Sequence, residues 1–93
     1  MRVSFKSFGP IRRAVGSPLV ELEVSKGSTV LQVIDSVIKA KGPGLERLIM
    51  DGNKISGSLI VLLNRRDIDT LQGTETAVND GDEIALLPHV QGG

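Results

Sequence analysis

The chain has 93 residues, which fits one domain and excludes a large enzyme fold. Eleven Lys plus Arg balance eleven Asp plus Glu, so the net charge argues against a protein that relies on a basic field to bind nucleic acid or anionic lipid. The absence of Cys and the single histidine, His89, exclude disulfides, thiolate chemistry and Cys- or multi-His metal sites. The longest apolar run is Leu59–Leu63 and no signal peptide is recognisable, so we expect a cytoplasmic protein without membrane contact.

The first part of the chain predicts a hairpin. Val3 and Phe5 alternate with polar residues, which indicates a strand over about residues 2–8 with one buried face. Segment 9–18 contains two Gly and two Pro and is interpreted as a connection. A second alternation over residues 20–24 predicts the partner strand, so the two strands form a hairpin with a long loop.

One main helix is predicted next, over about residues 29–41. Thr29 and Gln32 have the spacing of a capping box, which satisfies free backbone groups at a helix start. Gly42 and Pro43 supply a stop, because Gly tolerates the left-handed cap and Pro cannot continue the helix. The apolar face at helical spacing consists of Val30, Ile34, Val37 and Ile38.

The rest of the chain predicts two more strands. Residues 45–50 suit a short turn of helix, and residues 51–58 form a polar loop. Residues 59–63 are apolar on both faces, so this strand is central or its second face meets something. A turn at 80–82 precedes the last strand at 83–87. The order predicts an α+β domain with one helix on one face of a mixed sheet. Its expected core is Val3, Phe5, Val20, Leu22, Ile34, Val37, Ile84 and Leu86.

The chain ends in Gly92-Gly93, shortly after Pro88 closes the last strand. We therefore expect a domain over residues 1–88 and a flexible tail over residues 89–93, which can extend about 16 to 18 Å into a partner's active site. Glycine suits such a tail because it has no side chain to clash in a narrow channel. The ionised carboxylate of Gly93 can attack the α-phosphorus of ATP, and adenylation then makes it an electrophile.

A set of motifs spread over nearly the whole chain resembles the ubiquitin-like sulfur carriers of the MoaD/ThiS superfamily. Its nearest relatives are the small subunit of molybdopterin synthase and the small archaeal modifier proteins. The motifs are Val3-x-Phe5-x-x-Phe8, Arg12 to Gly16, Gly27-Ser28-Thr29-Val30, Val61-Leu62-Leu63-Asn64, Asp80-Gly81-Asp82-Glu83 and Pro88-His89-Val90-Gln91-Gly92-Gly93.

The resemblance implies a ubiquitin-like β-grasp fold and a carrier or modifier that is not itself an enzyme. Gly93 would be adenylated by an ATP-dependent activating enzyme, then converted to a thiocarboxylate or conjugated to a lysine, with Gly92 giving access. The sulfur would serve molybdopterin or tRNA thiolation. Further partners would be the large subunit of molybdopterin synthase or target-protein lysines, and no cofactor would be bound to this chain itself.

The residues expected to meet these partners are Arg12 and the tail with its root, Leu87, Pro88, His89, Val90 and Gln91. The sequence departs from the family pattern at three places. His89 stands where the synthase subunit usually has a second Pro, and Gln91 replaces a small residue common before the glycines. Segment 65–78 is longer than in the compact form of the family, so no family positions are assigned there.

Several residues keep two interpretations. Leu87 is either an exposed docking residue on the second sheet face or a core residue covered by the long loop. The paired arginines at 12–13 and 65–66 are either solvated charges or contacts for phosphate or an acidic partner. The acidic residues at 80–83 are expected to form a turn, and no metal site is predicted. The alternative function is a β-grasp interaction module without C-terminal chemistry.

Overall fold

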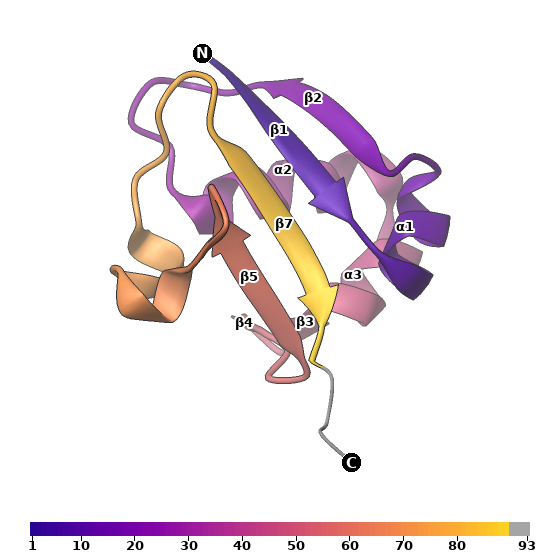
Figure 1. Cartoon of the computed structure of the whole chain (residues 1–93). Coiled ribbons are helices and arrows are strands. Elements are labelled where there is room, and N and C mark those ends of the chain that lie inside the picture. The colour runs from indigo at the N-terminus through magenta and orange to yellow at the C-terminus, as the bar shows by residue number, and fades with distance from the viewer. Residues whose placement is uncertain (90–93) are drawn as a thin grey trace.

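The computed structural model describes residues 1–89, and the predicted tail residues 90–93 lie outside this range. A five-stranded sheet has the order β2-β1-β7-β5-β6 (Figure 1). Its strands are β1 (Arg2–Ser7), β2 (Leu19–Glu23), β5 (Leu59–Leu63), β6 (Arg66–Asp67) and β7 (Glu83–Pro88). The α-helices of this range are α1 (Gly9–Val15), α2 (Val30–Lys41) and α3 (Pro43–Ile49). The fold also contains two short 3-10 helices, η1 (Ile68–Thr70) and η2 (Gly73–Glu75). A small separate hairpin is formed by β3 (Met50–Asp51) and β4 (Lys54–Ile55).

The sheet is mixed, as predicted. β1 is antiparallel to β2, with Phe5 opposite Val20, and parallel to β7, with Phe5 opposite Ile84. β5 is antiparallel to β7, with Val61 opposite Leu86. The first and last strands of the domain therefore lie side by side at the centre of the sheet (Figure 1).

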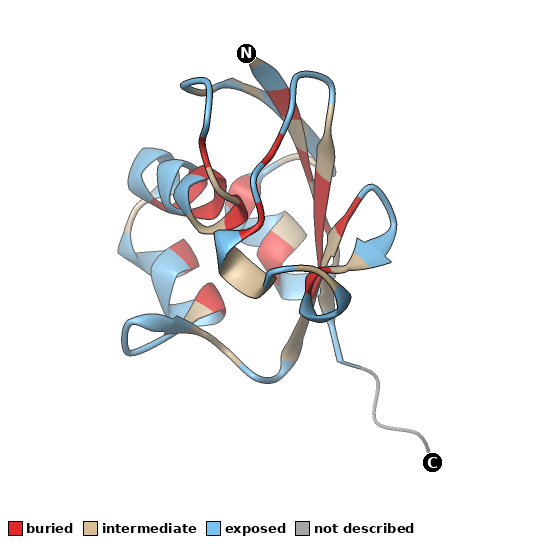
Figure 2. Ribbon diagram, turned by 90° about the vertical axis from the view of Figure 1, so that its left-hand side faces the viewer, coloured by how far each residue is buried: buried red, intermediate tan, exposed pale blue. Residues whose placement is uncertain are grey.

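One core fills the space between the helices and one face of the sheet (Figure 2). Six of the eight expected core residues are buried: Val3, Phe5, Ile34, Val37, Ile84 and Leu86. The other two, Val20 and Leu22, are partly buried and pack against the core because they lie on the edge strand β2. Side chains along β1 thus alternate between the two faces of the sheet, with Val3 and Phe5 in the core and the polar residues between them on the opposite face.

The predicted capping box opens α2. The Gln32 amide donates 3.2 Å to the Thr29 hydroxyl, and the Thr29 amide donates 2.9 Å to the Gln32 side-chain oxygen. The helix ends at Gly42, whose amide donates to the carbonyl of Ile38, and α3 begins at Pro43. No helix within residues 1–89 combines the length and apolar character needed to cross a membrane.

The prediction that residues 9–18 form an irregular connection is wrong, because this segment contains α1. Pro10 lies in the first helical turn, where its missing N–H costs nothing, and Gly16 ends the helix in the left-handed conformation with φ 91°. Ile11 and Val15, four residues apart, are its buried side chains. The Gly and Pro residues therefore mark the ends of a short helix rather than its absence.

One further expectation needs correction. The predicted polar loop at 51–58 includes β4 and the end of β3, which form a small hairpin. β5 lies between β7 and β6, in agreement with the prediction of a central strand, although β6 pairs only with Leu62 and Leu63. Its side chains divide by face: Val61 and Leu63 are buried on the helix side, while Ile60 and Leu62 are half-buried on the other.

The hydroxyl of Ser7 is buried and has no hydrogen-bond partner within residues 1–89. An unsatisfied buried hydroxyl loses its hydration without compensation. We predict that Ser7→Ala leaves the free energy of unfolding unchanged or raises it by about 1 kcal/mol, measured by urea denaturation.

Ser28→Ala is the matched control, because the Ser28 hydroxyl donates 2.7 Å to the carbonyl of Ser25. Its loss should lower the free energy of unfolding by about 1 kcal/mol. Equal destabilisation by the two substitutions would contradict the prediction.

Candidate functional site

The root of the tail is held by the end of β7. Pro88 lies opposite Leu59, and the amide of the next residue, His89, donates 2.7 Å to the carbonyl of Ser58. In antiparallel pairing, hydrogen-bonded and non-bonded pairs alternate, so the missing N–H of Pro88 falls at a non-bonded pair and leaves the β5 ladder intact. Residues 90–93, which include the predicted Val90, Gln91, Gly92 and Gly93, lie outside the described range.

An apolar surface lies beside the tail root, on the sheet face opposite the helices, here called the open face. Leu87 is half-buried and pairs across the strands with Ile60. Ala85 is next along β7 on this face, opposite Leu62. On the far side of β1, Leu19 is 47% exposed. The structure thus places Leu87 in an apolar row with Ile60, Ala85 and Leu62 rather than alone, and Lys6 on β1 separates this apolar row from Leu19.

Arg12 reaches the same end of the sheet. Because β1 and β7 run parallel, Phe8 and α1 follow at the end from which the tail leaves (Figure 1). The Arg12 Nε donates 3.0 Å to the carbonyl of Ser7, and its guanidinium lies 5.2 Å from the centre of the Phe8 ring. Lys6 places its ammonium 5.6 Å from that ring. Within residues 1–89 neither cation forms an ion pair.

The sequence analysis did not single out Lys6 and Phe8 as part of this cluster. The available signal was that Phe8 is one of only two aromatic residues and that Lys6 lies two positions before it and Arg12 four positions after it. Cations are attracted to the electron-rich face of an aromatic ring, so Phe8 holds two positive charges close together. We call Lys6, Phe8 and Arg12 the cationic cluster.

The other arginine pair lies elsewhere. Arg65 occupies the turn between β5 and β6, where Asn64 and Arg65 both have positive φ. Because the tail root lies beside Ser58, before β5 begins, this turn is at the opposite end of the strand. The structure therefore brings Arg12 to the tail root but not Arg65 or Arg66.

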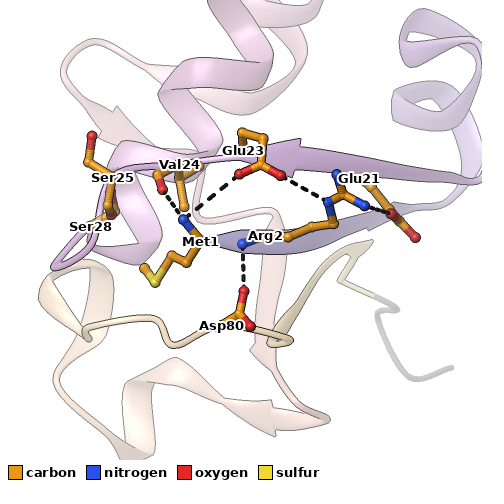
Figure 3. A network of polar contacts seen from close by, with 8 residues as sticks. All are labelled: Met1, Arg2, Glu21, Glu23, Val24, Ser25, Ser28 and Asp80. Atoms are coloured by element: carbon orange, nitrogen blue, oxygen red, sulfur yellow. Dashed lines mark hydrogen bonds and ion pairs between the residues drawn. The ribbon is translucent and has the colours of Figure 1, made fainter.

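The acidic turn at 80–83 forms structural contacts, as expected. Asp82 accepts hydrogen bonds from the side-chain amide of Asn64 at 2.9 Å and the backbone amide of Asn79 at 2.7 Å. Asp80 accepts the Arg2 backbone amide at 2.7 Å (Figure 3). Gly81 adopts φ 89°, which a residue without a side chain permits. In the described part of the chain, no three His, Asp or Glu residues are arranged to hold a metal ion.

The ion pair between Lys39 and Asp35 on α2 changes the pKa of the lysine. The hydrogen bond and charge of Asp35 raise the pKa of Lys39, whose ammonium lies 2.9 Å from the carboxylate. This pair is on α2, on the other side of the domain from the open face, and keeps Lys39 protonated. The groups around the tail root are apolar or cationic, which suits docking to a partner.

Comparison with known proteins identifies the family. The ThiS family matches residues 6–93, which includes the Gly-Gly end. The chain belongs to this family. It is 30% identical to small archaeal modifier protein 3 of Haloferax volcanii over the full length of both chains.

Solved structures agree with the family assignment and confirm the ubiquitin-like β-grasp fold. The solution structure of small archaeal modifier protein 1 from Methanosarcina acetivorans has a TM-score of 0.85 and 33% identity, covering 99% of this chain and 96% of the other. CysO in the BexX/CysO complex of Amycolatopsis orientalis has a TM-score of 0.80 and 30% identity, covering 98% and 99%. The ThiS family chain thus resembles small modifier and carrier proteins over its whole length.

The contacts of Asp82 lead to a stability prediction. Asp82→Ala removes the acceptor of two hydrogen bonds: one comes from Asn64, the residue after β5, and the other comes from the Asn79 amide within the turn before β7. We expect the free energy of unfolding to fall by about 2 to 3 kcal/mol, because hydrogen bonds to a charged group exceed neutral ones in strength. Thermal or urea denaturation measures it.

Asp69→Ala is the control, since the Asp69 side chain accepts no hydrogen bond within residues 1–89 and is exposed. It should change stability by at most about 0.5 kcal/mol. Equal free energies of unfolding for Asp82→Ala and Asp69→Ala would contradict the prediction that the Asp82 carboxylate stabilises the turn.

Proposed function

We propose that this ThiS family protein is a ubiquitin-like carrier or modifier whose reactive group is the C-terminal carboxylate of Gly93. The observation that carries the proposal is the family match, which continues through the Gly-Gly end. The root geometry supports it, because β7 ends at the edge of the domain and four residues follow His89. These four residues can span at most about 14 Å.

The proposed chemistry begins with activation of the carboxylate. A Gly93 carboxylate oxygen attacks the α-phosphorus of ATP, the bond to the bridging oxygen breaks, and pyrophosphate leaves. ATP is bound by the activating enzyme, and this chain contributes the acyl group alone. The product is a mixed anhydride with AMP, in which the Gly93 carbonyl carbon has become an electrophile.

Two fates of this acyl adenylate are open. A sulfur nucleophile displaces AMP and leaves a thiocarboxylate or thioester, which can supply sulfur to molybdopterin or to tRNA thiolation. Alternatively, the ammonium of a target lysine loses its proton and the amine displaces AMP, giving an isopeptide bond. Both fates need the same exposed carboxylate and differ only in the nucleophile that the partner supplies.

Docking of the activating enzyme is proposed to use the surface at the tail root. The apolar row on the open face supplies a contact area that loses water on association. The cationic cluster beside it suits acidic side chains of the partner, because its charges are held in place and unpaired within residues 1–89. Pro88 at the end of β7 and the tail residues His89, Val90 and Gln91 would continue this contact to Gly92 and Gly93.

Deleting Gly93 tests the chemical part of the proposal. The new carboxylate on Gly92 would lie about 3.5 Å short of the activating site. We expect ATP–pyrophosphate exchange with the cognate activating enzyme to fall about a hundredfold or more, since small displacements of reacting atoms are costly. Intact mass should show no exchange of oxygen for sulfur.

Gly92→Val serves as the partner variant, because it keeps the chain length but puts a β-branched side chain into the channel. Both variants should melt like the parent, since the buried core of residues 1–89 ends at Leu86 and chain termini contribute little to a core. Full activity of the Gly93 deletion would reject the carrier proposal and leave the interaction module.

The docking part of the proposal is tested by Leu87→Asp and Arg12→Ala. Leu87 is half-buried, so Asp there should weaken binding to the activating enzyme about tenfold or more with little loss of melting temperature. Arg12→Ala should weaken association more at low than at high salt. Binding is measured by calorimetry or surface plasmon resonance.

The melting temperature separates the two interpretations of Leu87. A large fall with unchanged affinity would assign Leu87 to the core and contradict the docking role. Glu75→Ala, an exposed substitution in η2, is a suitable control for unspecific effects on binding.

A further inference from the structure

The turn before β5 holds the backbone of His89. Pairing between β5 and β7 continues one residue past Pro88, because the His89 amide donates 2.7 Å to the carbonyl of Ser58. This turn lies beside the point at which the chain leaves the sheet (Figure 1). Within residues 1–89, the bond at His89 is therefore the last backbone contact before the tail. We call residues 56–59 the root turn.

Ser58 is itself held by contacts within the root turn. The Leu59 amide donates 3.1 Å to the carbonyl of Ser56, which closes a β-turn. The Ser58 amide donates 3.2 Å to the Ser56 hydroxyl oxygen, and the two serine hydroxyls lie 2.8 Å apart. The Leu59 amide and the Ser58 carbonyl belong to one planar peptide unit, so the bond that closes the turn also aims this carbonyl at His89.

The root turn is joined to the core. The Ser56 amide donates 2.8 Å to the carbonyl of Ile49, whose side chain is fully buried at the end of α3. Ile55, the residue before the turn, pairs with Met50 in the small hairpin and packs against the core. A series of backbone hydrogen bonds thus runs from the end of α3 through the root turn to His89. The position of His89 is therefore set by the core as well as by β7.

Without the bond at His89 the tail would begin earlier in the chain. Hydrogen-bonded pairs alternate along an antiparallel ladder, so the preceding bonded pair is Leu87 with Ile60. Opening the last bond would lengthen the free segment from residues 90–93 to residues 88–93. The probability that a flexible segment reaches a fixed point falls with about the 3/2 power of its length. Delivery of the C-terminal carboxylate to a fixed site would therefore fall about twofold.

We propose that Ser56 and Ser58 are positioning residues for the reaction of Gly93. Their turn holds the His89 amide, this bond stays closed while the carboxylate is activated, and His89 is the pivot from which the tail extends. The inference rests on the proposed function, because it concerns how the Gly93 carboxylate is delivered. It assigns a role to the backbone of His89 and none to its imidazole.

A disulfide in place of the hydrogen bond tests whether the pivot stays closed. The Cα atoms of a hydrogen-bonded antiparallel pair lie about 5.5 Å apart, which a disulfide can span. The chain has no Cys, so Ser58→Cys with His89→Cys creates a single possible bridge within the molecule. Intact mass confirms the oxidised form by the loss of two hydrogens. ATP–pyrophosphate exchange with the cognate activating enzyme is then measured before and after reduction.

The oxidised form should have a kcat/KM equal to that of the reduced form within about twofold, or higher, because the bridge keeps closed a contact that is already closed. Loss of exchange on oxidation, with recovery on reduction, would show that the root must open and would overturn the proposal. His89→Cys alone cannot form the internal bridge and is the matched control. Parent protein with and without reductant corrects for effects on the activating enzyme.

Variants of Ser56 test the root turn without the activating enzyme. Ser56→Ala removes the hydroxyl that accepts the Ser58 amide, and Ser56→Thr keeps it. Hydrogen exchange of the His89 amide, measured by NMR, should be about fivefold faster in Ser56→Ala, the effect of one weakened hydrogen bond. It should stay at the parent rate in Ser56→Thr. The amide of Leu87, which bonds to Ile60, should exchange at the parent rate in both variants. Unchanged exchange at His89 in Ser56→Ala would contradict the role of the turn.

Activity of the same variants tests delivery of the carboxylate. Ser56→Ala should lower kcat about twofold with little change in KM, because the apolar row and the cationic cluster are untouched, and Ser56→Thr should restore kcat. A change in KM alone would assign Ser56 to docking and reject a positioning role.

Failure of this inference differs from failure of the proposed function. If the parent chain supports no exchange, the proposed function fails and the positioning role falls with it. If the parent is active and the oxidised variant is inactive until reduced, the proposed function stands and the closed pivot is rejected.

Discussion

The parallel pairing of β1 with β7 is the contact on which the rest of the molecule depends. It joins residues near the two ends of the described chain, with Phe5 opposite Ile84 and Ser7 opposite Leu86. Two parallel neighbouring strands cannot be joined by a tight turn, because the chain must first return to the end of the sheet at which the first strand began. The connection between β1 and β7 therefore contains all the other elements of the domain. The intervening strands β2, β5 and β6 join the same sheet, and the helices α1, α2 and α3 pack on one face of it.

That pairing also decides where the functional groups lie. Because both strands run in the same direction, the end of β1 and the end of β7 reach the same edge of the sheet. The chain after β1 places Phe8 and Arg12 there, and the chain after β7 continues from His89. The cationic cluster and the tail root are thus neighbours although about eighty residues separate Arg12 from His89 in sequence.

The one-sided core leaves the two faces of the sheet with different surroundings. The helices cover one face of the sheet, so the apolar side chains Leu87, Ile60 and Leu62 stay half-buried on the open face. The outer strand β2 adds Leu19, Glu21 and Glu23 to this face, and both carboxylates contact Arg2 on β1. The open face is therefore apolar near the tail root and charged beside β2.

The sequence alone indicated much of this fold, because local rules agree with the final structure at many positions. The capping box at Thr29 and the alternation along β1 depend on neighbours in the chain, and both were recognised correctly. The Gly and Pro residues of segment 9–18 were misinterpreted, since the same residues end helices and interrupt them. Only the spacing of Ile11 and Val15 distinguishes the two cases, and two residues are a weak periodic signal.

What the sequence determined was the main helix α2, the strands β1, β2, β5 and β7, and the C-terminal Gly-Gly motif, because secondary structure and short motifs depend on residues close together in the chain. What only the tertiary structure decided was which of these elements meet. The place of Arg12 beside Phe8 at the tail root, and the free edge of β2, follow from strand order and register. Strand order is set by packing of the whole core, in which contacts between distant residues compete, and no local pattern carries that information.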